Sequence, residues 1–555
     1  MKKKMSFYLI LAFQLFISNC LKCGTDLLNI VPGKIKITNI KRKTQVTASE
    51  YTKIKIKVDM TQIEQQNQKN IMSNEKLQNL KNIFNEVVES FQKIISVQHF
   101  AYLANDYSYL IKENCGIDYF DETLKSGVLS DDLLIFPSLD LDNILSENVL
   151  AAATPCIQAE NSNRPLAGIV LINKDLMTNK YDYNYYMKNL LFHELTHVLG
   201  FHPSYFKILG LTHSETIDGE KYTYINSKKV LERAKIHFGC DSIKGVQLEN
   251  QGGDGSMGSH WESRYMLGDY MISSDYTEVV MSDITLALLE DTGYYKINYY
   301  TGGLFRFGKN QGCAFLEKKC LYDKGQKTLF SNEFCVNGGE AFCSGSNIAK
   351  GDCYITNYQN QLSDKYRYFE DNTKGGLPIA DYCPVSNLYK SDLDNNYFYP
   401  KNCIYGKKEF ILDNIGSNSI CFESSISSSN KESICYEIEC KKSEKKFNVK
   451  IGNSVVTCPG EDANLNNPNN LEGVLHCPDY NMVCTSDTWC NEMFDCIDKE
   501  SVTDDTTYDY ISNKQALIVR DRENLLVEES HFEDKDSFLN IKLKNIFYFL
   551  CLLFL

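Results

Sequence analysis

The sequence lacks an excess of positive charge. Its 58 lysines and arginines are outnumbered by 72 aspartates and glutamates, which gives a formal net charge of -14. Apart from short clusters at 2–4 and 41–43, the basic residues are scattered along the chain. Such a chain offers no extended positive surface to nucleic acid or to anionic lipid. We therefore exclude nucleic acid as a partner.

Long apolar runs are also missing. Residues 1–20 have a basic start and an apolar run that ends at small and polar residues, which predicts a secretory signal peptide. The alternative, an N-terminal anchor helix, needs a longer run. At the other end, the apolar residues 546–555 would span only about 15 Å as a helix, roughly half of a bilayer's hydrocarbon core.

The apolar C-terminus favours a GPI-attachment signal at 537–555, because a short apolar end behind a polar stretch is typical of one. Ser537 is, however, followed by Phe538 and Leu539, where small residues are expected. The alternative is a buried or disordered tail. The acidic stretch 501–536 before it is interpreted as a stalk.

The chain has no Asn-x-Ser/Thr sequon and no internal repeat of the length that builds solenoids. What it does have is 43% hydrophobic and 23% charged residues over 555 positions, which predicts folded protein with more than one core. It also has 21 cysteines, which in a secreted protein are mostly disulfides. Cys115 and Cys156 form a plausible pair around a predicted strand at 131–136.

Fifteen of the cysteines lie in the segment from Cys313 to Cys496, whose sequence is polar and has little long-range hydrophobic periodicity. This pattern predicts a disulfide-rich, loop-rich domain over 306–500, held by cross-links more than by a large core. Before it, an amphipathic helix is predicted at about 75–95 and a strand at 167–173. Residues 51–60 alternate as a strand does.

The stretch LFHELTHVLGFH contains the strongest chemical signal in the chain. It lies in a helical pattern from about 184 to Gly200, where glycine favours a helix end. His193 and His197 are four apart, so on a helix both imidazoles point to one side, as a zinc ion requires. Glu194 points aside, which suits a general base more than a ligand. Chance occurrence of H-E-x-x-H is the alternative, and the apolar helix and the glycine stop argue against it.

A catalytic zinc usually has three protein ligands. In the compact pattern H-E-x-x-H-x-x-G-x-x-H the third histidine follows the glycine by three residues, but here that position is Pro203. His202 is one residue early and precedes a proline that restricts its backbone. His260 is the favoured third ligand, because glycine-rich chain precedes it and Met271 follows eleven residues later. An ordinary loop histidine is the alternative for His260.

Several motifs in order resemble the leishmanolysin family of surface zinc proteases, a branch of the metzincins. The motifs are HELTHVLGF, HFGC, LENQGGDGSMGSHWE, ITLALLEDTGYYKINY and FGKNQGC. That family inserts a long segment between the glycine and the third histidine. The resemblance therefore implies that His260 is the third ligand and that Met271 forms the Met-turn, a methionine-bearing turn beneath the metal.

The resemblance implies an α+β, metzincin-like catalytic domain, with a twisted mixed sheet and an active-site helix, before the cysteine-rich C-terminal domain. We expect a prosegment at 21–44, an N-terminal catalytic subdomain at 45–200 and a central subdomain with the third ligand at 201–305. The family's prosegment carries a latency cysteine in an H-x-C-x-H-D setting. Here the counterpart is LKCGTD, with Cys23 and Asp26 but neither histidine, so latency through Cys23 competes with a plain disulfide.

The sequence thus predicts a secreted or cell-surface endopeptidase with one catalytic zinc, cutting proteins or peptides. Zinc held by His193, His197 and His260 would lower the pKa of a bound water and polarise the scissile carbonyl, with Glu194 as general base. Trp261 is expected to pack, and Asp291 and Gly293 to support the core. The alternative function is an inactive, metzincin-like surface adhesion protein that acts through its cysteine-rich domain.

Overall fold

The computed structural model describes residues 22–23, 28, 30–35 and 37–38, and most of 51–484. Within 51–484 the positions left out are 100, 104–106, 126–127, 130, 146–148, 178–182, 254, 275–279, 298–304, 393–396, 401, 404–405, 407, 417, 427, 429 and 442. The signal peptide, stalk and attachment signal predicted above lie outside the described residues. No helix in the described part of the chain is both long and apolar enough to cross a bilayer.

A mixed sheet forms the centre of the N-terminal half. Its order is β1-β10-β11-β9-β5, and β2 also pairs with β10. β10 and β11 are antiparallel, whereas β9 pairs in parallel with both β11 and β5. The strands are β1 Lys22–Cys23, β2 Gly33–Ile35, β5 Ile56–Val58, β9 Leu133–Asp140, β10 Val149–Ala159 and β11 Pro165–Asn173.

The three central strands, β9, β10 and β11, are buried along their whole length, as expected for a sheet covered on both faces. The strands predicted at 131–136 and 167–173 correspond to β9 and β11. β10 was not predicted, because its alanines favour helix and Pro155 argues against a central strand. The pairing register shifts next to Pro155, which accommodates the missing N–H.

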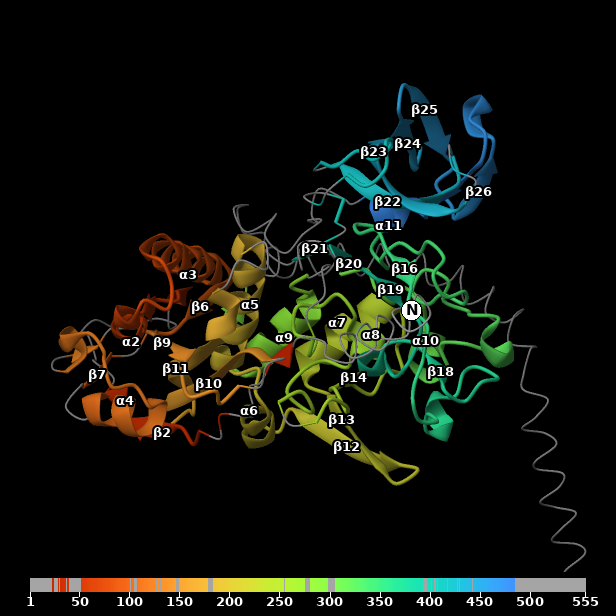
Figure 1. The fold of residues 1–555 in the computed structure, drawn as a ribbon. Helices are drawn as coiled ribbons and strands as arrows, with labels where there is room; N and C mark the ends of the chain where they lie inside the picture. The colour runs from red at the N-terminus through yellow and green to blue at the C-terminus, as the bar shows by residue number, and fades with distance from the viewer. Residues whose placement is uncertain are drawn as a thin grey trace, which may run out of the picture.

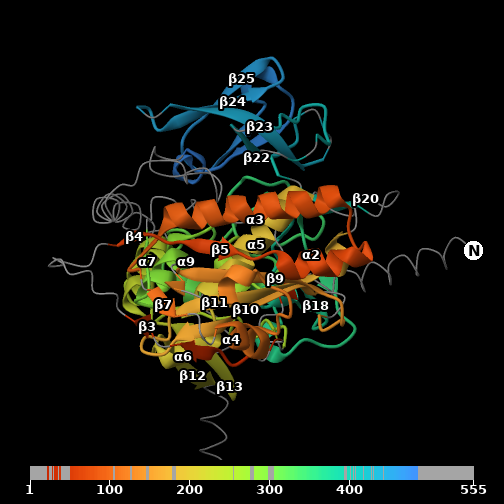
Figure 2. The same ribbon diagram turned by 90° about the vertical axis from the view of Figure 1, so that its left-hand side faces the viewer.

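Helices cover both faces of this sheet (Figure 2). On one face lie α3 (Asn74–Ile94) and α5 (Tyr183–Leu199), whose Phe91 and Phe192 rings are 5.1 Å apart. α5 approaches β11 closely because Gly168 has no Cβ, which would lie 2.3 Å from Val198. On the other face lies α4 (Tyr107–Cys115), tied to β10 by the predicted disulfide Cys115–Cys156.

The predicted strand at 51–60 is instead two short strands in different sheets, β4 (Thr52–Lys53) and β5. The other short elements of this half are α2 Thr61–Gln66, β3 Ile37–Thr38, β6 Ile95–Val97, β7 Ala101–Leu103, β8 Val128–Leu129 and β15 Lys296–Ile297. β4, β6 and β15 form one small sheet, and β3, β7 and β8 form another.

The segment after α5 packs beside the main sheet (Figure 1). It comprises α6 Pro203–Ile208, β12 Thr212–Ile217, β13 Glu220–Ile225, α7 Lys228–Phe238, β14 Val246–Gln247, α8 Ser263–Met266 and α9 Asp283–Asp291. The Asp291 carboxylate accepts hydrogen bonds from the backbone N–H groups of Lys229 and Val230, so the end of α9 caps the start of α7.

The cysteine-rich region has two packing regions. Many buried side chains between Phe305 and Leu388, such as Phe315, Phe334 and Val385, belong to the same core as α3 and α5. A six-stranded antiparallel sheet of order β25-β24-β23-β22-β27-β26 has its own core, with Phe422, Tyr436 and Phe447 (top of Figure 1). Its strands are β22 Ser419–Ser424, β23 Glu432–Lys441, β24 Lys446–Ile451, β25 Ser454–Cys458, β26 Ala463–Asn466 and β27 Val474–Cys477.

Short elements and disulfides complete this region. The elements are α10 Cys313–Glu317, β16 Asp352–Cys353, β17 Thr356–Asn357, β18 Lys374–Gly375, β19 Ser386–Asn387, β20 Tyr389–Asp392, β21 Tyr397–Pro400 and α11 Tyr480–Val483. Of the eight disulfides among the described residues, six lie wholly within 306–500. Cys240–Cys313 ties the region to the end of α7.

Candidate metal centre

α5 carries two histidines on its buried side. His193 and His197 lie one helical turn apart, and they are 7% and 0% exposed. α5 ends at Leu199, and Gly200 follows with a positive φ of 120°. The chain then turns back, and Phe201 donates its N–H to the carbonyl of Thr196.

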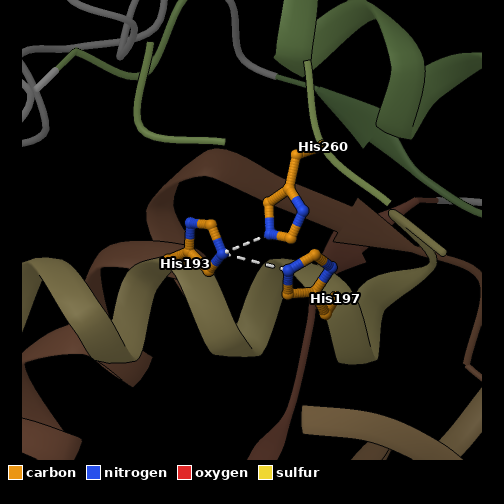
Figure 3. A group of neighbouring side chains, drawn as sticks. All are labelled: His193, His197 and His260. Carbon is orange, nitrogen blue, oxygen red and sulfur yellow. Dashed lines mark hydrogen bonds between the residues drawn. The ribbon is translucent and has the colours of Figure 1, made fainter. Parts of the chain in front are cut away.

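His260 reaches the same point from the loop between β14 and α8 (Figure 3). Four glycines of this loop, Gly252, Gly253, Gly255 and Gly258, have positive φ of 71–91°, a conformation that other residues rarely adopt. The loop is fixed by backbone hydrogen bonds from Glu249 N–H to the His260 carbonyl and from Trp261 N–H to the Met271 carbonyl. His260 is fully buried.

The Nε2 atoms of the three histidines converge. His193 Nε2 lies 3.0 Å from His197 Nε2 and 3.2 Å from His260 Nε2, and the ligand atoms of all three lie within 4.8 Å of one another. Zinc bonds of about 2.0–2.1 Å at tetrahedral angles place ligand nitrogens about 3.3 Å apart. The cluster therefore fits a single zinc ion.

The other ring nitrogen of each histidine faces a backbone carbonyl. His193 Nδ1 donates to Tyr270 at 2.6 Å, His197 Nδ1 donates to Phe201 at 2.7 Å, and His260 Nδ1 donates to Ser256 at 3.0 Å. These bonds hold the proton on Nδ1 and leave an Nε2 lone pair aimed at the centre. Three lone pairs pointing at one another repel, and a cation between them removes that repulsion.

Burial also favours the neutral, metal-binding form of these rings. Desolvation lowers the pKa of His193 to about 4 and that of His260 to about 3, and it lowers the pKa of His197 well below its ordinary value. Neutral imidazole is the form that coordinates zinc. The three rings thus offer free lone pairs over the whole neutral range of pH.

His202 lies outside this cluster. It precedes α6, and its Nδ1 accepts a hydrogen bond from the backbone N–H of Ser204 at 3.3 Å, so it caps that helix. His237 also lies elsewhere, stacked on Phe305 with its Nε2 bonded to the Phe307 carbonyl. The structure therefore brings His260, and neither of these two, to the histidines of α5.

Glu194 is completely buried on α5, directly after His193. Cys23 lies in β1, where its backbone pairs with Ala151 at the edge of the main sheet. Met271 is fully buried in the turn that also supplies the Tyr270 carbonyl to His193.

A buried polar network holds this turn, and sequence reasoning missed it. The Asp269 carboxylate accepts hydrogen bonds from Met271 N–H at 2.7 Å and from the Thr285 hydroxyl at 2.8 Å. The Thr285 hydroxyl oxygen in turn accepts a hydrogen bond from the indole N–H of Trp261 at 2.8 Å. Trp261 therefore packs inside the protein, as expected. Burial raises the pKa of Asp269 to about 6. The signal available in the sequence was an aspartate two residues before the expected Met-turn methionine.

The carbonyls of Phe201, Ser256 and Tyr270 were also missed. Every residue has a backbone carbonyl, so no side-chain pattern identifies the ones that orient the histidines. The available signal was that these three residues lie close in the sequence to His197, His260 and Met271.

Comparison with known proteins relates the chain to one family. A sequence profile of the family described as leishmanolysin matches residues 32–490. A leishmanolysin homolog from Crithidia fasciculata is 30% identical over 368 residues, which cover 61% of this chain and 54% of that protein. A leishmanolysin from Leishmania tropica is 26% identical over 357 residues, covering 61% and 53%. A leishmanolysin-like peptidase from Caenorhabditis elegans is 27% identical over 368 residues, covering 54% and 55%. The chain spans about half the length of these curated relatives.

Proposed function

Because the chain belongs to the leishmanolysin family, we propose that it is a zinc metalloendopeptidase that cuts proteins or peptides at the cell surface or in the extracellular space. The observation that carries this proposal is the convergence of three Nε2 lone pairs, each oriented by a carbonyl on Nδ1. His193, His197 and His260 would hold the ion. When bound, zinc would act as a Lewis acid that polarises the scissile carbonyl and lowers the pKa of the attacking water.

In the proposed reaction, Glu194 moves the proton. A carboxylate oxygen of Glu194 accepts a proton from the water as it attacks the peptide carbon, and returns it to the amide nitrogen as the C–N bond breaks. Met271 has a structural role, since its turn carries the Tyr270 carbonyl that orients His193. The buried position of Glu194 beside His193 supports its role as the base.

We propose that residues 21–44 are a prosegment removed before activity. Two of its strands, β1 and β2, pair in parallel with β10, so this segment occupies an edge of the catalytic sheet. Cys23 lies in the first of them. Secretion through residues 1–20 and a GPI anchor formed at 537–555 stay predictions of the sequence.

Zinc content and casein hydrolysis, compared between the wild-type protein and Glu194→Ala, test the proposed activity. We expect both proteins to contain one zinc per chain and only the wild type to cleave casein. Loss of activity by two to four orders of magnitude is typical when a general base is removed. If both proteins are folded, zinc-loaded and equally inert, the adhesion function replaces the protease.

A further inference from the structure

A cavity of about 280 Å³ lies in the cysteine-rich region, between residues 328–353 and the six-stranded sheet. One wall comes from the loops around Asn332 and Glu340, and the other from β22, β26 and β27 of the sheet. β16, at the end of the first wall, lies below the six-stranded sheet in Figure 1. Boundaries between packing units are a usual place for ligand sites.

The two walls are fixed to each other. The disulfide Cys343–Cys421 crosses between them, and the Asn347 carbonyl accepts a backbone hydrogen bond from Cys421. A second disulfide, Cys335–Cys353, lies in the floor of the cavity. A preformed site of this kind loses little conformational entropy when a ligand binds.

The charges in the lining argue against an anionic ligand. The two basic side chains are each paired with an acid: Lys431 with Glu423, and His476 with Asp462 at 3.1 Å. Glu340 adds a further carboxylate at the exposed rim. A phosphate, sulfate or acidic peptide would meet no uncompensated positive charge here.

The rim offers many groups that both donate and accept hydrogen bonds. Asn332, Asn337 and Asn464 supply amides, and Ser331 supplies a hydroxyl. Asn337 Nδ2 donates to the Glu340 carboxylate at 3.1 Å, so an amide and a carboxylate lie side by side at the edge. The floor beneath is apolar, with the buried Phe334 and Phe342.

We propose that this cavity is a binding site for a neutral saccharide. Sugar hydroxyls donate and accept hydrogen bonds as amides do, and their ring C–H faces suit an apolar floor. The volume of about 280 Å³ lies just below the range of about 300–1,000 Å³ that is usual for ligand pockets, which fits one or two sugar rings and not a helix or a folded partner. None of the three histidines of the metal cluster lines the cavity, so saccharide binding itself does not depend on the proposed proteolysis.

The test is binding of the full-length protein carrying Glu194→Ala to an array of immobilised neutral oligosaccharides ending in mannose, galactose, glucose, fucose or N-acetylhexosamine. We expect binding to at least one class, and at least tenfold weaker binding for Asn332→Ala and for Asn464→Ala, which change opposite walls. Asn448→Ala is the matched control, because Asn448 is a half-buried asparagine on β24 of the same sheet outside the cavity. Thermal midpoints of all variants check that each is folded.

Absence of binding to every member of the array overturns the proposal, and so does binding that both cavity variants retain. If the variants instead lose binding to unglycosylated β-casein peptides, the cavity is a peptide site and the saccharide assignment is wrong. A final arm distinguishes the source of the sugar. The wild-type enzyme is assayed on serum albumin conjugated with the bound oligosaccharide and on bare albumin. If the natural ligand is a glycan on a substrate, we expect a lower KM for the conjugated albumin. Equal KM values indicate a free saccharide.

Discussion

His193 donates its Nδ1 proton to the carbonyl of Tyr270, 2.6 Å away. The residue immediately before Met271 therefore orients the first histidine of α5. This contact links two parts of the chain separated by 77 positions, and it explains how a turn with no metal ligand of its own contributes to the geometry of the metal centre.

The first prediction separates His260 from His202. His260→Ala should lose zinc, because two imidazoles on one helix leave the ion without its third protein ligand. His202→Ala should keep zinc and lose only about 1 kcal/mol of stability, since His202 caps α6. Metal content after dialysis, measured by atomic absorption, gives the answer. Full zinc occupancy in His260→Ala would exclude this ligand set.

The second prediction concerns removal of the metal. Treatment with 1,10-phenanthroline should abolish the proposed peptidase activity and lower the thermal midpoint by roughly 5–15 °C, because an ion that binds only the native state stabilises it. It also leaves three buried Nε2 lone pairs facing one another. Added zinc should restore both quantities, whereas magnesium should not. An unchanged midpoint on chelation would mean that the cluster holds no structural or catalytic ion.

The third prediction tests the network beneath the Met-turn. Thr285→Val keeps the shape of the side chain but leaves the Trp261 indole N–H without an acceptor and removes a donor from Asp269. We expect destabilisation of about 2–4 kcal/mol. Thr223→Val is the matched control, because Thr223 bonds to Ser214 on an exposed hairpin. Differential scanning calorimetry of both variants measures the effect.

The same variant carries a pH signature. Burial already raises the pKa of Asp269 to about 6, and loss of the Thr285 donor should raise it further. A raised folded-state pKa means that the group's stabilising contribution is present at low pH and is lost as pH rises through that pKa. The deficit of Thr285→Val relative to wild type should therefore be larger at pH 8 than at pH 5. A deficit independent of pH would show that Asp269 is not coupled to Thr285.

The fourth prediction addresses latency. If the Cys23 thiolate blocks the proposed zinc site before processing, Cys23→Ser should be active towards casein without removal of residues 21–44. Lys34→Ala, a change in β2 of the same segment, should remain latent. The assay is casein hydrolysis by the secreted, unprocessed proteins, with the N-terminus of each checked by mass spectrometry. If the Cys23→Ser protein is still inactive, the Cys23 thiolate is not what blocks the site. The pairing of β1 and β2 with β10 would then be the source of inhibition.

Much of the catalytic half could be predicted because its signals are local. The periodicity of α3 and the apolar runs of β9 and β11 follow directly from residue order. β10 could not be predicted, because its alanines and proline disfavour a strand in isolation. Only pairing with β11 and packing against the covering helices stabilise the strand in the folded protein. The sheet β22–β27 was missed although Lys446–Ile451 alternates polar and apolar residues, because most of its strands are short and they gain their core only when six of them pair.

The sequence by itself determined the chemistry of this protein: H-E-x-x-H on an apolar helix, a glycine at its end and a distant histidine before a methionine specify the groups that zinc needs. Only the tertiary structure decided how those groups meet. Imidazoles four residues apart share a helix face by helical geometry alone, but His260 reaches them because Gly253 and Gly258 let its loop fold back. The direction of each lone pair is set by carbonyls of Phe201, Ser256 and Tyr270, and a backbone acceptor acquires its partner only when the chain is folded.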